Sequence, residues 1–456
     1  MEQWIWRNLT VATETPRRNN ALLQLLKMRT TLNATDDVRS QSTLRKSLLP
    51  FVRTLKIELY HLKHLCESCR HIPRFLQECS DLRALEIYSE ENFGSRAPWH
   101  FHPGTVFALG LMLPSSVTRL RLQGADLETP TDSEHMAGAL GLSQMTALEI
   151  YGCTNVSPFV KAFCRQIRTG TTGLRLESVD IRLIVEAGEN DFKAVAELLR
   201  TAKRLKRIVL DTGETNPLES THFNLDCITR HGDALKTLLL RSVVEYDFQT
   251  NNSEDDELED SEDNESEDDE FGGQPMFIGP WLRMEYLCRI IDACPQLEQL
   301  GTFLPMHPSY HAILRKNKVN KTLFPLAIIA WARNLHTLRI ICDPGFEGQI
   351  PEKALETTLA GYAKELFQLF CSHGSQVKTI TFTNYHDYFE DSSLLHSFSR
   401  EDLFDGEPVR ELNADELSSL VLSSHMLYRA RIHHSMHMLA EEFNAGMVHG
   451  VSPNLL

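Results

Sequence analysis

The stretch ECSDLRALEIY, Glu78–Tyr88, contains the pattern from which the fold can be worked out. Leu82, Leu85 and Ile87 follow the form Φ-x-x-Φ-x-Φ, where Φ is an apolar residue and x is any residue. The alternation in the second half of this pattern is the period of a β-strand. Cys79 lies three positions before the first Φ, and a small side chain there would let the end of a preceding helix approach the strand closely.

The pattern recurs along the chain and predicts a repeating unit. Ten copies begin at Val52, Leu82, Val117, Met145, Thr171, Leu205, Leu235, Leu297, Leu335 and Val377. Successive copies begin 26 to 42 residues apart, except for one interval of 62 residues. Further small residues stand three positions before the first Φ at Ala202, Gly232, Cys294 and Ala332.

Helix-period sequences precede several copies of the pattern. They are FKAVAELLRTAKR from Phe192, WLRMEYLCRIIDAC from Trp281, LAIIAWARN from Leu326 and LAGYAKELFQLFC from Leu359. A helix, a turn and a strand repeated about every thirty residues are typical of a solenoid. We therefore predict an α/β fold, a leucine-rich-repeat solenoid (horseshoe) of about ten irregular repeats. The alternative is an ordinary α/β protein, but no glycine-rich phosphate loop follows any of the strands.

The interval of 62 residues contains an acidic tract, SEDDELEDSEDNESEDDE, Ser253–Glu270. Its eighteen residues hold thirteen carboxylates and no base, and the rest of the chain has 49 carboxylates against 46 bases. So few apolar groups cannot offset the entropy of ordering the segment. We predict an acidic disordered insertion, residues 250–274, within one repeat.

The chain is expected to have four parts. Residues 1–44 form an N-terminal lead-in, residues 45–390 the solenoid that contains the insertion, and residues 391–456 an irregular segment with a capping helix. The stretch after Asn413 has helical periodicity and no turn residues between Asp415 and Asn444, although LSSLVL from Leu417 could form an eleventh strand. A helical cap would cover the exposed edge of the last repeat.

Composition limits the cellular context and the chemistry. No apolar run is long enough to span a membrane and the first residues do not resemble a signal peptide, so we expect a cytoplasmic or nuclear protein. The ten cysteines are scattered, which favours buried free thiols over disulfides. No catalytic or cofactor motif is present, so we expect neither an enzyme nor a bound cofactor.

The sequence contains two clusters of potential metal ligands. The first, HLKHLCESCRH, contains His61, His64, Cys66, Cys69 and His71. A structural zinc site needs a second ligand pair, and no second C-x-x-C exists, so a helix with two buried thiols is the preferred interpretation. The second, His433, His434 and His437, lacks the glutamate of a helical zinc motif and is interpreted as a solvated helix face. No metal is expected.

The repeat units resemble a known family. ECSDLRALEIY, ACPQLEQLGTF and ARNLHTLRII are similar to the irregular leucine-rich repeats of fungal F-box-type proteins, with the phrase C-x-x-L-x-x-L. The resemblance covers roughly residues 45 to 390. WIWRNLTVATE, Trp4–Glu14, also resembles the segment that follows the F-box in such proteins. The F-box itself is absent from this sequence, which leaves two alternatives: an N-terminally truncated gene model, or a protein without the adaptor link.

The resemblance implies a protein-interaction module that acts as an F-box-like substrate receptor for a ubiquitin ligase. It would bind a protein target, which could be acidic or phosphorylated, and it would bind the ligase adaptor only if an F-box lies upstream. The alternative is a stand-alone leucine-rich-repeat scaffold or regulator with no ligase link. No membrane partner is expected, and the acidic balance of the chain argues against nucleic acid.

Charge at the x positions predicts where the target would bind. Among thirty such positions eleven are basic and three are acidic, so we expect an electropositive concave face. The candidate ligand-binding residues are Arg119, Arg121, Arg175, Lys206, Arg207, Lys236 and Arg339. The simpler interpretation is that these bases only keep an exposed sheet soluble. In the acidic tract, Ser253 and Ser266 each precede three carboxylates and are candidate phosphorylation sites.

Overall fold

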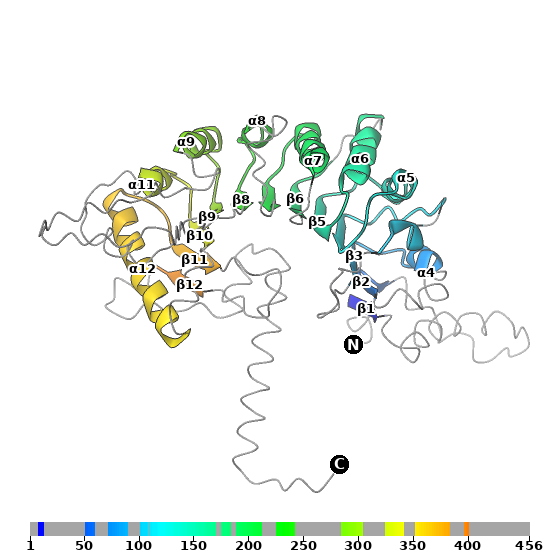
Figure 1. Cartoon of the computed structure of the whole chain (residues 1–456), viewed down its shortest axis with the longest axis horizontal. Helices are drawn as coiled ribbons and strands as arrows, with labels where there is room; N and C mark the ends of the chain where they lie inside the picture. The colour runs from blue at the N-terminus through cyan, green and yellow to red at the C-terminus, as the bar shows by residue number, and fades with distance from the viewer. Residues whose placement is uncertain are drawn as a thin grey trace, which may run out of the picture.

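The protein has an α/β fold with a long, mostly parallel open sheet (Figure 1). The computed structural model describes residues 8–12, 51–59, 72–89, 101–107, 109–169, 175–183, 188–211, 225–241, 284–303, 324–341, 352–383 and 396–400. Twelve strands in this part form one sheet in sequence order. They are β1 (Asn8–Ala12), β2 (Thr54–Leu59), β3 (Ala84–Ser89), β4 (Arg119–Gln123), β5 (Ala147–Cys153), β6 (Ser178–Leu183), β7 (Arg207–Asp211), β8 (Thr237–Arg241), β9 (Gln299–Phe303), β10 (Thr337–Ile341), β11 (Thr379–Thr383) and β12 (His396–Ser399).

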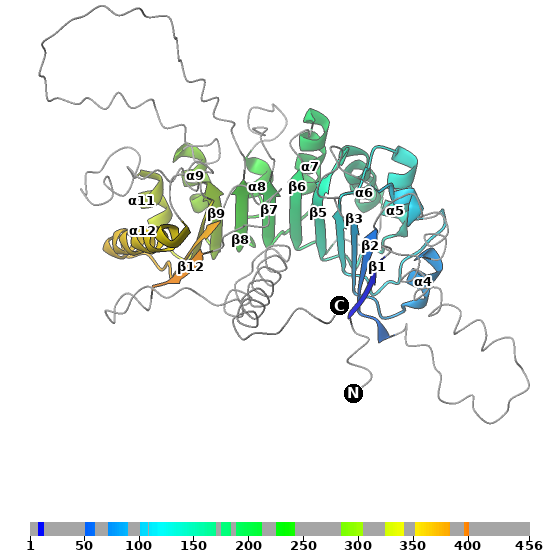
Figure 2. The ribbon, with the colours of Figure 1, turned by 60° about the horizontal axis from the view of Figure 1, so that its bottom comes forward.

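Helices lie along one side of this sheet, as Figures 1 and 2 show. The described helices are α4 (Ile72–Glu78), the 3-10 turn η4 (Pro103–Thr105), α5 (Pro130–Ala139), α6 (Ser157–Thr169), α7 (Glu189–Thr201), α8 (Asp226–Thr229), α9 (Met284–Ala293), α11 (Phe324–Ala330) and α12 (Glu352–Ser372). The four helix-period sequences singled out above fall in α7, α9, α11 and α12, which confirms those predictions. Each helix connects two neighbouring strands, so the first eleven strands run parallel.

The core lies between the sheet and the helices. The last two Φ positions of each repeat align across the sheet, so that Leu85 pairs with Leu120 and Ile87 with Leu122. These four side chains are fully buried. Alternate residues of a strand point to opposite faces, so the positions between them point away from the helices. We call the surface formed by these positions the outward face.

A row of backbone hydrogen bonds fixes the register where the strands begin. The carbonyl oxygen of Arg53 accepts the N–H groups of Arg83 and Ala84 at 2.7 and 3.0 Å. The same forked bond recurs from one repeat to the next, with the carbonyl oxygens of Arg83, Thr118, Thr146, Glu177, Lys206, Lys236, Glu298 and His336 as acceptors. We call this row the entry ladder. It satisfies backbone groups that would otherwise be buried without partners.

The acidic tract falls between two neighbouring strands. β8 pairs with β9 in parallel, and the carbonyl oxygen of Lys236 accepts the N–H groups of Glu298 and Gln299 at 2.8 and 2.9 Å. The sheet and the entry ladder are therefore continuous across the long interval. The tract itself, with Ser253 and Ser266, lies outside the described residues, as does the predicted capping helix.

Two predictions about strands need correction, and the sheet has one parallel strand in addition to the ten copies. The fifth copy was placed at TTGLRL from Thr171, but β6 begins at Ser178, so the copy is LESVDI from Leu176. The lead-in contributes β1, which pairs with β2 as a further parallel strand. Residues 396–399, expected to be irregular, form β12 antiparallel to β11. There Phe398 packs on Phe382 with ring centroids 5.8 Å apart, which explains why so short a strand is held.

The small residues before each strand are where tight packing was predicted. Cys79, Ala202, Cys294 and Ala332 are all buried. Gly232 has no room for a side chain, because a Cβ there would lie 1.7 Å from the carbonyl oxygen of Ala293. These contacts confirm that the helix ends lie close to the neighbouring repeats.

Most of the cysteines described are buried free thiols, as predicted. Cys79, Cys153, Cys164, Cys227 and Cys294 are buried, and Cys288 and Cys371 are half-buried. Burial raises the pKa of the Cys79 thiol to about 12, and the nearby Glu78 carboxylate adds to this shift. Such a thiol is almost wholly protonated at neutral pH and is unreactive. None of the described helices is long and apolar enough to cross a membrane.

Candidate functional site

The outward face of β2 to β6 carries an alternating row of cations and tyrosines. The ammonium group of Lys56 lies 4.6 Å from the ring centre of Tyr88, and the guanidinium of Arg121 lies 5.7 Å from the same ring. Arg121 also lies 4.5 Å from the ring centre of Tyr151, and Arg182 lies 4.7 Å from it on β6. All four distances are within the range of a cation–π contact. We call these five residues the cation–tyrosine row.

The tyrosine hydroxyls tie this row to carboxylates. Tyr88 donates to Glu86 at 2.8 Å and accepts from Arg121 Nη1 at 2.8 Å. Tyr151 donates to Glu149 at 3.1 Å. Burial raises the pKa of both tyrosines above their ordinary value, so both keep the proton that they donate.

Glu149 joins two arginines on the neighbouring strand. Its carboxylate accepts from Arg119 Nε at 2.8 Å and lies 3.0 Å from Arg121 Nε. Burial lowers the pKa of Arg121, but the interactions of its guanidinium with Tyr151 and Glu149 outweigh burial and leave that pKa above its ordinary value. Arg121 is 3% exposed and Glu149 8% exposed. A buried arginine paired in this way remains charged.

Asp180 extends the network to β7. Its two carboxylate oxygens lie 3.3 Å from Arg182 Nε and 3.3 Å from Arg207 Nη2. Asp180 is buried, and both arginines are largely covered. The network therefore runs without a break from β2 to β7. Most of its charged groups are paired with one another on the outward face and are covered from solvent.

Two donors and one acceptor at the centre of the network lack hydrogen-bond partners among the described residues. Arg121 Nε and Nη2 and Gln123 Oε1 are buried and form no hydrogen bond in the part of the chain described, although Nε lies 3.0 Å from the Glu149 carboxylate. They belong to alternate residues of β4 and so lie on the same face of the sheet. A group with both a donor and an acceptor, such as an amide, would satisfy Arg121 Nη2 and Gln123 Oε1.

The predicted binding residues are only partly brought together. Arg119, Arg121 and Arg207 lie on the outward face and take part in the network, and Arg339 is buried on the outward face of β10. Lys206 and Lys236 lie in the entry ladder, where they pair with Glu177 and Glu298 at 2.8 and 2.7 Å. Arg175 lies outside β6, because the strand begins at Ser178. Whether any of them binds a ligand stays a prediction.

Several residues of the site were missed by sequence reasoning. Asp180 and Arg182 were missed because the fifth repeat was placed too early in the sequence. The correct phrase, LESVDIRL, places both residues on the outward face. Tyr88 and Tyr151 directly follow the last Φ residue of their repeats, a position that the Φ-x-x-Φ-x-Φ pattern does not include. With these residues included, the outward face of β2 to β7 is mixed in charge, whereas the x positions alone predicted a basic surface.

The outward face differs further along the sheet. The row that holds Arg121, Glu149 and Asp180 continues as Val209, Leu239 and Gly301 in β7, β8 and β9. Val209 and Leu239 are buried although they point away from the helices. A Cβ at Gly301 would lie 2.7 Å from the side chain of Leu239, so the glycine makes room for its neighbour.

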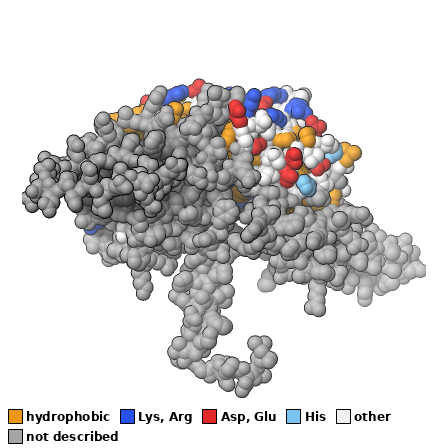
Figure 3. Space-filling view, viewed as in Figure 1, with side chains coloured by type: hydrophobic (Ala, Val, Ile, Leu, Met, Phe, Trp, Pro, Cys, Tyr) orange, Lys and Arg blue, Asp and Glu red, His pale blue; other side chains and the backbone are white. Residues whose placement is uncertain are grey.

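Charges on the helix side are also paired. Arg165 of α6 lies 2.7 Å from Glu134 of α5, and Arg168 of α6 lies 2.7 Å from Glu197 of α7. In Figure 3 basic and acidic side chains are intermixed over this part of the surface. Such exposed pairs contribute little to stability. This side offers a comparison for the outward face, because its arginines are equally charged and far more exposed.

Within the described residues, no group of histidines, cysteines and carboxylates could hold a metal ion. The cluster from His61 to His71 and the histidines from His433 to His437 lie outside them. The interpretation of those clusters as metal-free therefore stays a prediction.

Comparisons with known proteins add little to the geometry. No protein-family model and no curated protein matches the chain. Among solved structures it is similar to the crystal structure of the leucine-rich repeat-containing protein LegL7 from Legionella pneumophila. The two are 11% identical, the match covers 93% of this chain and 97% of that chain, and the TM-score is 0.40. A likeness of this extent carries no functional information.

Proposed function

We propose that this protein is an interaction scaffold of the leucine-rich-repeat class, a horseshoe-shaped solenoid that binds a protein partner on its outward face. Two features support the proposal: the recurrence of one helix-and-strand unit, and the entry ladder that joins each unit to the next. In such architectures an open sheet face is a surface for recognition.

The observation that carries the proposal is the cation–tyrosine row with its carboxylates. Its side chains are fixed by contacts to one another before any partner arrives, so little entropy would be lost on binding. Tyrosine and arginine are the residues enriched where interfaces gain most of their energy. Arg119 still exposes 30% of its side chain, and Lys56 and Glu58 expose 17% each.

The pairing of charges also narrows the kind of partner. A polyanion would have to compete with Glu86, Glu149 and Asp180 for the arginines. A protein surface that carries both donors and acceptors would instead add to the existing network. We therefore favour a partner of mixed polarity on this face over the acidic or phosphorylated target suggested by the x positions.

The test compares captured proteins between two variants of the full chain. Replacing Arg119 and Arg207 by alanine should abolish capture of the main partner, measured by quantitative mass spectrometry. Replacing Arg165 and Arg168 on α6 by alanine removes the same charge from the helix side and should leave capture unchanged. Equal capture by both variants, with both folded by circular dichroism, would contradict the outward face as the binding surface.

The narrower form of the proposal, a substrate receptor for a ubiquitin ligase, rests on the resemblance of Trp4–Glu14 to the segment after an F-box. Within that segment residues 8–12 form β1, which leads into the repeats. The test is co-purification of the ligase adaptor with the natural full-length product of the gene. Recovery of the adaptor would support the receptor, and capture of a partner without the adaptor would leave the stand-alone scaffold.

A further inference from the structure

An exposed tryptophan stands beside a hollow on the edge of the sheet where the strands begin. Trp331 exposes 65% of its surface, which is unusual for so large an apolar side chain. The hollow has a volume of about 370 Å³ and opens to solvent. The residues that line it include Trp331, Arg333, His373, Gly374 and Gln376.

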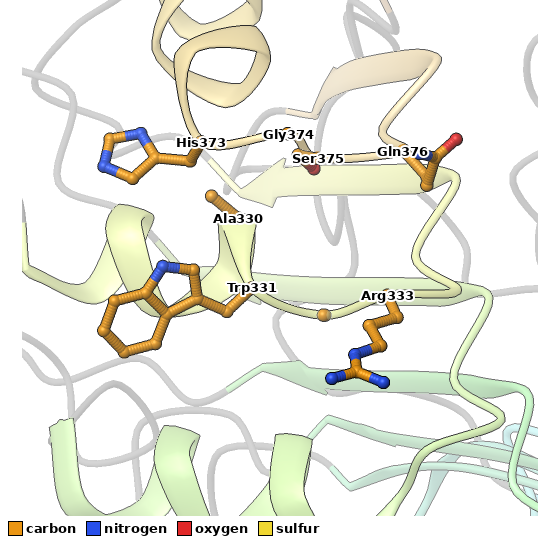
Figure 4. Close-up of a pocket in the computed structure, with 8 residues that line it drawn as sticks. Ala330, Trp331, Arg333, His373, Gly374, Ser375 and Gln376 are labelled. Carbon is orange, nitrogen blue, oxygen red and sulfur yellow. The ribbon is translucent and has the colours of Figure 1, made fainter.

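The hollow is formed by the turns that end two neighbouring helices. α11 ends at Ala330 and α12 at Ser372, and each turn leads into the next strand, β10 or β11. Gly374 has a φ of 71°, a conformation that favours glycine and that turns the chain sharply after α12. Figure 4 shows the Trp331 and His373 side chains extending to the same side of the ribbon from these two turns.

The charges beside the hollow are not balanced. Earlier in the entry ladder Lys206 and Lys236 each pair with a glutamate on an adjacent repeat. Lys378 occupies the same position before β11, but its neighbours in the ladder are His336 and Arg400, neither of which is acidic. Lys378 is exposed and forms no ion pair with any described residue.

Arg333 adds a second exposed cation to the wall of the hollow. It too forms no ion pair with any described residue, and the described stretch 324–341 contains no acid. An exposed aromatic ring and an open hollow with Arg333 in its wall therefore lie on one edge, separate from the outward face. Lys378 follows two residues after Gln376, which lines the hollow, and neither cation forms an ion pair with any described residue.

We propose that this hollow binds an acidic segment of a protein partner. An apolar side chain of the segment would pack against Trp331, and carboxylates on either side of it would pair with Arg333 and Lys378. Charge complementarity selects the acidic segment, and the exposed ring accounts for the apolar side chain between the carboxylates. The site does not depend on the partner proposed for the outward face.

The test uses the full chain and a labelled synthetic peptide, acetyl-Asp-Glu-Phe-Glu-Asp-amide, in fluorescence anisotropy. The peptide should bind and should bind more weakly as salt is raised. Trp331→Ala should weaken binding about tenfold, as expected for an anchoring aromatic residue. Arg333→Ala with Lys378→Ala should weaken binding and reduce its salt dependence.

Two controls make the result specific. Arg83→Ala removes an exposed base from the same edge at the other end of the sheet and should change nothing. Asn-Gln-Phe-Gln-Asn, blocked in the same way, should not bind. Absence of binding at an acidic-peptide concentration of about 1 mM would overturn the proposal. A dissociation constant of about 1 mM corresponds to a binding free energy of about −4 kcal/mol. Unchanged binding by Trp331→Ala, or equal binding of the neutral peptide, would also overturn the proposal.

A further variant decides between a separate partner and the chain's own acidic tract. Deleting residues 253–270 should leave the affinity for the peptide unchanged if the hollow is free for a partner. A clear gain in affinity on deletion would overturn the choice of a separate partner, because it would show that the tract already occupies the hollow.

Discussion

Strands β2 to β6 carry Lys56, Tyr88, Arg121, Tyr151 and Arg182 in one connected row, whereas the same face of β7 to β9 carries Val209, Leu239 and Gly301. Both regions have the same buried apolar positions and the same forked bonds of the entry ladder. The same backbone frame thus carries different side chains on its outward face. Positions on the outward face can therefore differ between the two regions without a change in the frame.

The largest effect should come from breaking the shared frame. Leu238 on β8 is fully buried, and Leu238→Asp would place an unpaired carboxylate in the core. We expect a loss of at least about 4 kcal/mol in the free energy of unfolding, or failure to fold.

Leu120→Asp on β4 is the matched change in the other region and should cost a similar amount, because Leu120 is equally buried. Chemical denaturation measures both. A well-folded Leu238→Asp with unchanged stability would show that β8 does not share the frame of β4.

A smaller effect should come from the network, and only in the first region. Glu149→Gln removes the charge that pairs with Arg121 and leaves that buried guanidinium without its nearest carboxylate. We expect a loss of about 3 kcal/mol. Glu134→Gln, in an exposed pair with Arg165 on the helix side, should cost less than about 1 kcal/mol. If chemical denaturation gave equal losses of stability for Glu149→Gln and Glu134→Gln, the outward network would contribute no more than an exposed ion pair.

Packing between helix ends and neighbouring repeats should give the next effect. Gly232→Ala would force its Cβ against the carbonyl oxygen of Ala293 and should cost about 1 to 3 kcal/mol. Gly138 in α5 meets only an ordinary contact at 3.5 Å, so Gly138→Ala should stabilise the helix by up to about 1 kcal/mol. If Gly232→Ala and Gly138→Ala shifted the melting temperature in the same direction, the close approach of Gly232 to Ala293 would be contradicted.

The smallest effect is a dependence on pH. His231 is buried, its Nε2 lies 2.9 Å from the carbonyl oxygen of Leu199, and its Nδ1 accepts the N–H of Leu205 at 3.3 Å. Burial lowers the pKa of His231 below its ordinary value of 6.5, so the folded state holds the neutral ring.

The unfolded state then binds more protons, and stability should fall as the pH drops below 6.5. In His231→Gln the part of this loss of stability that is caused by His231 should disappear. The measurement is the melting temperature between pH 7.5 and 5, compared with that of the wild type. An identical pH profile in both proteins would rule out His231 as the cause.

The sequence predicted the shared backbone frame more accurately than the side-chain contacts of the outward face. The Φ positions and the small residues Gly232 and Cys79 follow local spacing, because a helix end and a strand must meet in every repeat. The fifth copy was misplaced because two overlapping phrases, TTGLRL and LESVDI, share Leu176, and only packing across the sheet selects the second.

The network of the face could not be predicted from spacing within a repeat. Whether Glu149 meets Arg121, or Asp180 meets Arg207, depends on the alignment between strands about thirty residues apart. Counting charges at the x positions therefore indicated a basic surface, although its acids and bases pair across neighbouring strands. β12 has only four residues and no repeat pattern, so it gave no signal in the sequence.

Hydrogen exchange of the full-length protein tests most directly whether one continuous frame joins the two regions. The amides of Glu298 and Gln299, which donate to Lys236 across the acidic tract, should be as protected as those of Thr146 and Ala147, which donate to Thr118. Rapid exchange of the first pair beside slow exchange of the second would contradict a continuous frame, because the sheet would then be interrupted between β8 and β9.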